Sequence, residues 1–156
     1  MPLNQQVSSE TPEAFSISNG MKKTIKNTTE LEQFAREFFA SLPTQTGATI
    51  VGLSGDLGSG KTTFAKAAAK VLGVEGVVLS PTFVIAKFYE IHDHPTWSRL
   101  VHIDAYRIED PAELRPLRWD ELISDPRNLL LVEWPEHVGV FFPPDVPTLS
   151  FRFVDE

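Results

Sequence analysis

Hydrophobic residues occur both at helical spacing and in short apolar runs along the chain. Near the start they recur every three or four positions behind a capping box formed by Thr29 and Glu32, which predicts an amphipathic helix ending near Pro43. The alanine-rich stretch 61–72 predicts a second helix, terminated by Gly73. Apolar runs predict strands at 48–54, 83–90, 99–106, 128–134 and 149–154. Strands that alternate with helices predict an α/β fold with a central, mostly parallel β-sheet flanked by helices.

Two segments fit this pattern less well. Residues 111–123 have helical composition but carry Pro116 in their interior, so we expect two short helices or a kink. Residues 1–22 are largely polar and predict a flexible N-terminal tail, followed by one domain over residues 23–156. Because Met21 looks like a natural start, we hypothesise that the first twenty residues are an added leader or a misassigned start. The intact mass of the native protein tests this, and a native product that carries these residues would refute it.

Length and charge narrow the picture. At 156 residues the chain is close to the usual domain size of about 150. The net charge of −7 is unevenly distributed: residues 1–103 contain nine basic and nine acidic residues, whereas residues 104–156 contain five arginines and twelve acids. This excess of acids argues against a chain that binds a nucleic-acid backbone by itself, and it favours binding of a metal ion or of a basic partner.

Several classes of site are excluded by what the sequence lacks. Without cysteine, the chain has no disulfides, thiolate zinc sites, iron–sulfur clusters or cysteine nucleophiles. No apolar run approaches the roughly 18 residues of a membrane span, and the first twenty residues lack the hydrophobic region of a signal peptide. We therefore expect a cytoplasmic protein without a membrane partner.

A complete phosphate-loop pattern, G-x-x-x-x-G-K-[ST], lies between an apolar run and a helix, at residues 55–62. Glycines permit positive φ and close backbone approach, so that successive N–H groups converge on phosphate oxygens at a helix N-terminus. Lys61 would bridge the β- and γ-phosphates of a nucleotide, and the Thr62 hydroxyl would be a ligand of Mg²⁺. The sequence thus predicts a P-loop NTPase-like domain. The expected nucleotide-binding residues are Asp56, Leu57, Gly58, Ser59, Gly60, Lys61, Thr62 and Thr63.

Two acids at the ends of predicted strands could complete this site. Asp104 ends an apolar run that His102 interrupts, and Glu133 ends an uninterrupted one. Carboxyl ends of parallel strands meet at one edge of a sheet, the edge at which the phosphate loop also lies. We predict that Asp104 and Glu133 are catalytic and, with Thr62, hold the metal and place the attacking water. The residues alone leave open which acid takes the Walker B position.

Other residues near these motifs give weaker signals. His102 is interpreted as a core histidine rather than a metal ligand. Trp134 belongs either to the core or to an aromatic wall of the site. Thr82 precedes a predicted strand at a point where nucleotide hydrolases have switch segments, so its hydroxyl is a candidate sensor of phosphate or metal. No arginine stands out as a finger for the transition state, which predicts slow turnover by the isolated chain.

Some classes of phosphate-loop protein can be tested by their further motifs. The Asn-Lys-x-Asp motif of guanine-binding proteins does not follow the loop, and the Leu-Ser-Gly-Gly-Gln signature of ABC cassettes does not occur. A small-molecule kinase commonly has an arginine-bearing lid, for which Arg115 and Arg118 are the candidates.

Four sequence blocks together resemble the bacterial TsaE family, also called YjeE. The blocks are residues 55–64 (GDLGSGKTTF), 80–83 (SPTF), 102–107 (HIDAYR) and 131–136 (LVEWPE), and they occur in the family's order and spacing. The resemblance covers roughly residues 24–154. It implies a weak, Mg²⁺-dependent ATPase that acts with the TsaD and TsaB proteins. They transfer a threonylcarbamoyl group to the tRNA adenosine beside the anticodon, so this chain would meet tRNA indirectly.

The resemblance also implies roles for individual residues. Lys61 and Thr62 would hold the phosphates and Mg²⁺, Asp104 would be the Walker B-like acid, and Glu133 would contact the metal or its water. Two further residues match positions that the family keeps near the nucleotide, Thr82 and Trp134. Two alternative functions stay open: a non-hydrolytic, ATP-dependent assembly factor for the same complex, and a small-molecule kinase.

Overall fold

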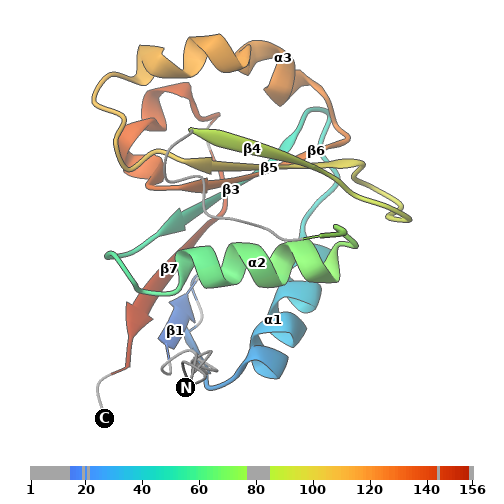
Figure 1. Cartoon of the computed structure of the whole chain (residues 1–156), viewed down its shortest axis with the longest axis vertical. Coiled ribbons are helices and arrows are strands. Elements are labelled where there is room, and N and C mark those ends of the chain that lie inside the picture. Colours follow the sequence, from blue (N-terminus) through green and yellow to red (C-terminus); the bar gives the residue numbers. More distant parts are fainter. Residues whose placement is uncertain (1–14, 19, 21, 77–84, 144, 155–156) are drawn as a thin grey trace, which may run out of the picture.

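A seven-stranded β-sheet runs through the computed structural model, which describes residues 15–18, 20, 22–76, 85–143 and 145–154 (Figure 1). The strand order is β2-β1-β7-β3-β6-β5-β4. The strands are β1 (Phe15–Ser18), β2 (Lys22–Ile25), β3 (Thr49–Ser54), β4 (Ala86–Glu90), β5 (Arg99–Asp104), β6 (Asn128–Glu133) and β7 (Thr148–Phe153). The α-helices are α1 (Thr28–Ser41), α2 (Lys61–Val71) and α3 (Trp119–Ser124), and the 3-10 helices are η1 (Pro111–Leu117), η2 (Pro135–His137) and η3 (Gly139–Phe141).

The four central strands of the sheet are parallel. β7, β3, β6 and β5 lie side by side in one direction. At one edge β4 pairs antiparallel with β5, and at the other the β1–β2 hairpin pairs antiparallel with β7. The predicted α/β fold with a central, mostly parallel sheet is therefore confirmed. Because these strands are parallel, the carboxyl ends of β3, β5 and β6 lie side by side along one border of the sheet, which is called its carboxyl edge.

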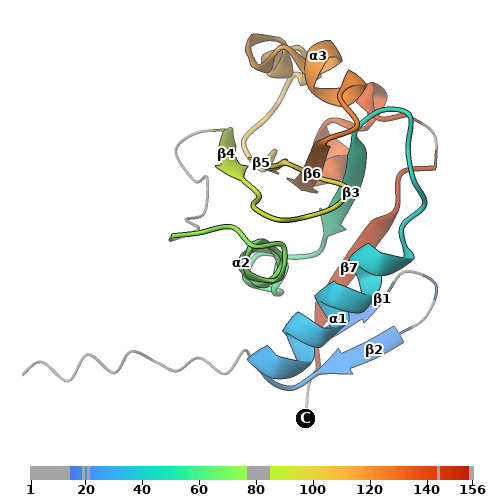
Figure 2. The ribbon, with the colours of Figure 1, turned by 90° about the vertical axis from the view of Figure 1, so that its right-hand side faces the viewer.

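Helices cover both faces of this sheet, as two views at right angles show (Figures 1 and 2). One core cluster lies between the sheet and α1 and α2, and a second lies under η1 and α3. Successive residues of β6 enter opposite clusters: Leu129 and Leu131 belong to the first, and Leu130 and Val132 to the second. Because both faces are covered, this strand is an uninterrupted apolar run.

An aromatic cluster anchors the start of α2. Phe64, in the first turn of the helix, is fully buried. Its ring centroid lies between 5.6 and 6.5 Å from those of Phe34, Phe38, Phe39 and Phe151. Such aromatic contacts add to the stabilisation from burial. They hold the N-terminus of α2, and with it the preceding glycine loop, against the core.

The N-terminal boundary of the folded domain differs from the prediction. β1 lies within the expected tail of residues 1–22, yet it pairs with both β2 and β7. The expected tail is therefore wrong for residues 15–18. A strand of four residues carries too little periodicity to stand out in the sequence, and its pairing with β7 joins segments from opposite ends of the chain.

The first helix begins earlier than its expected capping box. The Asn27 side-chain oxygen accepts a hydrogen bond from the backbone N–H of Glu30 at 2.9 Å, so Asn27 is the N-cap. Glu32 instead accepts a hydrogen bond from Lys70 of α2 at 2.8 Å. The box predicted at Thr29 and Glu32 is wrong, because asparagine caps helices at least as well as threonine and stands two residues before it.

The region around Pro116 forms two short helices, one of the two expected outcomes. η1 contains Pro116, and Arg118 in a left-handed conformation (φ +54°) separates it from α3. At the end of α2, Gly73 has φ +87°, as expected for a helix stop. Within the described ranges, none of the helices combines the length and apolar character needed to cross a bilayer.

Candidate functional site

The phosphate-loop segment forms the connection between β3 and α2. Gly55, Gly58 and Gly60 have φ angles of +147°, +75° and +112°, which residues with a side chain rarely adopt. A Cβ added at Gly55 would lie 2.5 Å from the carbonyl oxygen of Phe151 and 2.6 Å from the Ser59 hydroxyl oxygen, so a side chain has no room there. The loop leads into the N-terminus of α2, where unpaired backbone N–H groups and the helix dipole favour an anion.

Lys61 is buried beneath this loop, at 4% exposure. Its ammonium donates hydrogen bonds to the carbonyl oxygens of Gly55 and Asp56, the latter at 2.8 Å. Burial lowers the pKa of Lys61, and nearby acids, Glu133 first among them, partly offset that shift. The cation is thus held where a phosphate at the loop would be within its reach.

Glu133, the last residue of β6, joins three elements. Its side chain is 4% exposed, and its Oε1 accepts a hydrogen bond from the Thr62 hydroxyl at 3.0 Å. Its Oε2 lies 3.3 Å from the same hydroxyl and 2.6 Å from His102 Nε2 of β5. The structure therefore brings together two of the predicted site residues, Thr62 and Glu133, together with a histidine.

Asp104, the last residue of β5, lies directly beside Glu133 in the strand register. It is half-buried, and its Oδ1 accepts the backbone N–H of Tyr106 at 2.9 Å. Burial raises the pKa of Asp104; the Tyr106 hydrogen bond opposes the rise and the charge of Glu133 adds to it. The two acids are neighbours at the sheet edge, but their surroundings differ.

Trp134 follows Glu133 in a left-handed conformation, with φ +59°. The Lys61 ammonium lies 4.4 Å from the centroid of its ring. The ring also lies 5.1 Å from that of Tyr106 and 5.6 Å from that of His137. Trp134 is only partly buried and packs against the core cluster beneath α3. The two alternatives for this residue therefore combine: one side meets the core and another meets Lys61.

The remaining predicted loop residues differ in exposure. The exposed ones are Asp56, Leu57, Gly58 and Thr63. Ser59 is buried, and its hydroxyl has no hydrogen-bond partner among the described residues. Thr82, the candidate sensor, lies outside the described residues, so its role stays a prediction.

Two residues of this region were not assigned to the site from the sequence. His102 is fully buried, as expected for a core histidine, yet its ring meets a site acid. Glu136 accepts a hydrogen bond from the hydroxyl of Ser54, at the end of β3, at 2.6 Å. A signal for His102 was present, because residues two apart on a strand share a face and Asp104 lies two positions further on. Glu136 follows the strand in a 3-10 helix, where no simple periodicity applies.

These residues fit a nucleotide phosphate and Mg²⁺. The loop and Lys61 offer N–H donors, and Thr62, Asp104 and Glu133 offer oxygen ligands. No group of three or more histidine or acidic side chains that could hold a metal exists in the described part of the chain. Mg²⁺ is usually bound by one or two carboxylates together with substrate phosphates. A metal at this edge would therefore depend on the nucleotide.

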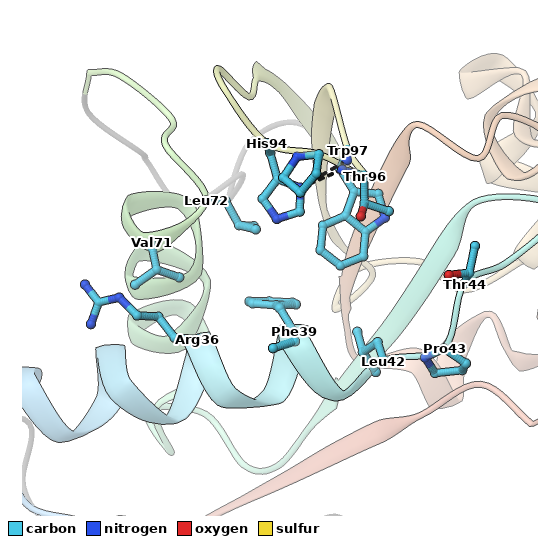
Figure 3. A pocket seen from close by; sticks show the side chains of 12 residues that line it. Arg36, Phe39, Leu42, Pro43, Thr44, Val71, Leu72, His94, Thr96 and Trp97 are labelled. Carbon is cyan, nitrogen blue, oxygen red and sulfur yellow. Dashed lines mark hydrogen bonds between the residues drawn. The ribbon is translucent and has the colours of Figure 1, made fainter.

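A hollow lies at the other end of the parallel strands, away from the phosphate loop (Figure 3). It has a volume of about 450 Å³ and lies between the C-terminal ends of α1 and α2 and the β4–β5 turn. Trp97, in its wall, donates a hydrogen bond to the hydroxyl of Thr49, the first residue of β3, at 3.1 Å. The His94 ring stacks on Trp97 at 4.9 Å. Its described lining contains no acidic residue, so it lacks the carboxylates gathered at the carboxyl edge.

Known proteins are similar to this chain over most of its length. The family model described as Threonylcarbamoyl adenosine biosynthesis protein TsaE matches residues 25–156. The tRNA threonylcarbamoyladenosine biosynthesis protein TsaE of Rickettsia typhi is 32% identical over 133 residues, which cover 85% of this chain and 86% of that protein. The protein of the same name from Borreliella burgdorferi is 32% identical over 131 residues, or 83% of this chain and 90% of the relative.

Two further comparisons agree with these. The TsaE protein of Streptomyces coelicolor is 45% identical over 89 residues, which span 56% of this chain and 57% of the relative. The crystal structure of Bacillus subtilis YdiB matches with a TM-score of 0.62 and 28% identity, over 83% of this chain and 74% of that one. By the family model and by relatives aligned over most of both lengths, this chain belongs to the TsaE family of tRNA threonylcarbamoyladenosine biosynthesis.

Proposed function

We propose that this chain binds ATP together with Mg²⁺ and hydrolyses it slowly, acting with TsaD and TsaB in threonylcarbamoyl transfer to tRNA. The observation that carries the proposal is the hydrogen bond from the Thr62 hydroxyl to Glu133. It joins the last residue of a phosphate-loop pattern to an acid at the end of a neighbouring parallel strand, which is the arrangement that phosphate-loop hydrolases use for the metal.

Phosphate binding would fall to the loop and to Lys61. The loop glycines adopt positive φ, which allows successive backbone N–H groups to face one anion, and we expect those of residues 58–63 to bind the phosphates. Lys61 has three N–H donors. Its present acceptors are carbonyl oxygens of the loop, and we expect a phosphate oxygen to take their place when the nucleotide binds. Burial strengthens such charge-assisted bonds, because the local dielectric is low.

Metal binding would fall to Thr62 and Glu133, with Asp104 beside them. When bound, Mg²⁺ neutralises charge that develops on the phosphate oxygens. The hydrogen bond between Thr62 and Glu133 supports Glu133 as the acid nearest the metal. This differs from the Walker B role that the resemblance implies for Asp104, and comparing Glu133→Gln with Asp104→Asn distinguishes the two assignments.

Asp104 is then the candidate for placing the attacking water. It is half-buried, and within the described residues its one hydrogen bond is to the Tyr106 N–H, so one carboxylate oxygen remains for water. Its raised pKa makes it a better proton acceptor than an ordinary aspartate. Glu133, by contrast, has both oxygens engaged.

Slow turnover fits the same geometry. An arginine finger contacts the transferred phosphate, and the sequence offers no clear candidate for one. A hydrolase without an arginine finger stabilises its transition state poorly, and such a finger is worth roughly 10³–10⁵ in rate. We therefore expect TsaD and TsaB to raise the rate of ATP hydrolysis.

The distribution of charge supports a role in which this chain does not bind the RNA directly. The twelve acids against five arginines in residues 104–156 would repel a phosphate backbone. We propose that contacts to tRNA belong mainly to the partners, and that the chain works with them in the cytoplasm.

Reconstituted tRNA modification tests the proposal. Phosphate release by the chain would be measured alone, and then with TsaD, TsaB and tRNA, for wild type and for a variant that binds ATP without hydrolysing it. Slow release that the partners accelerate supports the ATPase. Full modification by the hydrolysis-dead variant would instead indicate a non-hydrolytic assembly factor, and labelled phosphate on a metabolite would indicate a kinase.

A further inference from the structure

His102 interrupts an otherwise apolar face of the sheet. Leu100 precedes it on the same face of β5 and Leu131 lies opposite it on β6, and both belong to the core cluster under α1 and α2. His102 itself is 0% exposed. An apolar residue at this position would continue the core, so the polar ring calls for a physical reason.

Among the described residues the ring makes one hydrogen bond, and it is short. Its Nε2 lies 2.6 Å from Glu133 Oε2, with the two side chains 1% and 4% exposed. A carboxylate oxygen accepts hydrogen bonds, so Nε2 carries the hydrogen. The other ring nitrogen, Nδ1, is buried and has no hydrogen-bond partner among the described residues. An unpaired buried polar atom destabilises a fold, so the contact with Glu133 is the feature that accounts for a histidine here.

This contact makes the two oxygens of Glu133 different. Oε2 is held by His102, and Oε1 is the oxygen nearer the Thr62 hydroxyl, at 3.0 Å against 3.3 Å. A free glutamate side chain rotates about three torsions, and ordering it costs conformational entropy. The hydrogen bond from β5 fixes the carboxylate in advance, with Oε1 directed at Thr62.

We propose that His102 is a positioning residue, whose Nε2–H holds Glu133 so that Oε1 and the Thr62 hydroxyl are set for the same Mg²⁺. The inference rests on the proposed function. Groups that hydrogen-bond a metal ligand orient it, and their loss typically weakens metal binding by about 10–100-fold. His102 would not touch the nucleotide, the metal or the reacting atoms.

Two matched variants separate positioning from packing. His102→Gln keeps an N–H donor close to the position of Nε2, whereas His102→Met has a similar length without a donor. Calorimetry with a non-hydrolysable ATP analogue, in Mg²⁺ and in EDTA, measures how much the metal adds to affinity. We expect His102→Met to lose about tenfold or more of that gain, and His102→Gln to recover most of it. Affinity in EDTA should stay within about twofold of wild type in both, since the loop is untouched.

A measurement on the wild-type protein without nucleotide complements the variants. Nitrogen-15 NMR of the imidazole should show His102 with its hydrogen on Nε2, slowly exchanging with water. Glu133→Gln should shift that signal. A hydrogen on Nδ1 with Nε2 bare would overturn the proposed contact, whether or not either variant folds.

The outcomes also distinguish this inference from the proposed function. If wild type binds the analogue more tightly with Mg²⁺ and His102→Met does so equally, the positioning role is wrong and the nucleotide site stands. Equal losses in His102→Met and His102→Gln would likewise reduce His102 to a packing residue. If wild type binds no nucleotide in either condition, the proposed function fails and the positioning role fails with it.

Discussion

The ends of β5 and β6 carry one acid each, in direct register, yet the two regions are built differently. At the end of β6, Glu133 is buried and bonded to Thr62 and His102. At the end of β5, Asp104 is half-buried and bonded through one oxygen to a backbone N–H. Parallel pairing brings the acids together, but their neighbours decide what each can do. A fixed carboxylate suits a metal, and a freer one suits water.

Removing Lys61 should have the largest effect, because it is the buried cation of the phosphate loop and the charges of both acids act on it. We expect Lys61→Ala to bind ATP at least about 100-fold more weakly, since charge-assisted hydrogen bonds contribute about 1.5–3 kcal/mol each. Lys66→Ala, an exposed lysine of the same helix, is the control and should bind as wild type does. Calorimetry with an ATP analogue measures both variants, and equal affinities would contradict the assigned phosphate site.

Replacing each acid with alanine should lower the free energy of unfolding by different amounts. Glu133→Ala leaves the buried N–H of His102 without a partner, so we expect a loss of about 1–3 kcal/mol in the free energy of unfolding. Asp104→Ala removes a half-exposed side chain and should cost less than about 1 kcal/mol. Urea denaturation without metal or nucleotide measures both. Losses of the same size would mean that the two environments do not differ energetically.

A double-mutant cycle measures the buried contact itself. We expect His102→Met and Glu133→Met to show a coupling free energy of at least about 1 kcal/mol. The double variant should therefore be more stable than the sum of the two single losses predicts. The control is the pair Arg118 and Glu121, which has the same 2.6 Å separation but is exposed, and whose coupling should fall in the range of about 0.2–1 kcal/mol. A coupling free energy near zero for the buried pair would mean that the contact between His102 and Glu133 does not stabilise the end of β6.

The pH dependence of Asp104 should be the smallest effect. Burial raises its folded pKa above the unfolded value, so the folded state disfavours the charged form and stability falls as pH rises through the two values. Asp104→Asn should therefore be slightly more stable than wild type at neutral pH, by less than about 1 kcal/mol. The difference should vanish below about pH 3.9, the ordinary aspartate value. Urea denaturation from pH 3 to pH 7 checks this, and a wild type that is the more stable at neutral pH would contradict the assigned direction.

Much of this comparison was predictable from the sequence, because its signals are local. The glycine loop and the two acids at strand ends follow from residue types and spacing within short segments. The partners of those acids do not. The contact between His102 and Glu133 depends on the register between β5 and β6, which is a property of the sheet. For the same reason β1 was missed, since its partner β7 lies at the other end of the chain.

The N-cap of α1 was misplaced for a different reason. Asn27, Thr28 and Thr29 are all good capping residues, and the sequence offers acids three positions after Asn27 and after Thr29. Packing decides between the two: Glu32 turns toward Lys70 of α2, which leaves Glu30 for the helix start. Local preference narrows such choices, and tertiary contacts settle them.

The most direct test of the central claim is a calorimetric titration of wild type, Glu133→Gln and Asp104→Asn with a non-hydrolysable ATP analogue, in Mg²⁺ and in EDTA. We predict that Mg²⁺ strengthens binding to wild type and to Asp104→Asn, and that Glu133→Gln loses about tenfold or more of this gain. The contrary result is a wild type that binds no analogue, or one whose affinity does not respond to Mg²⁺.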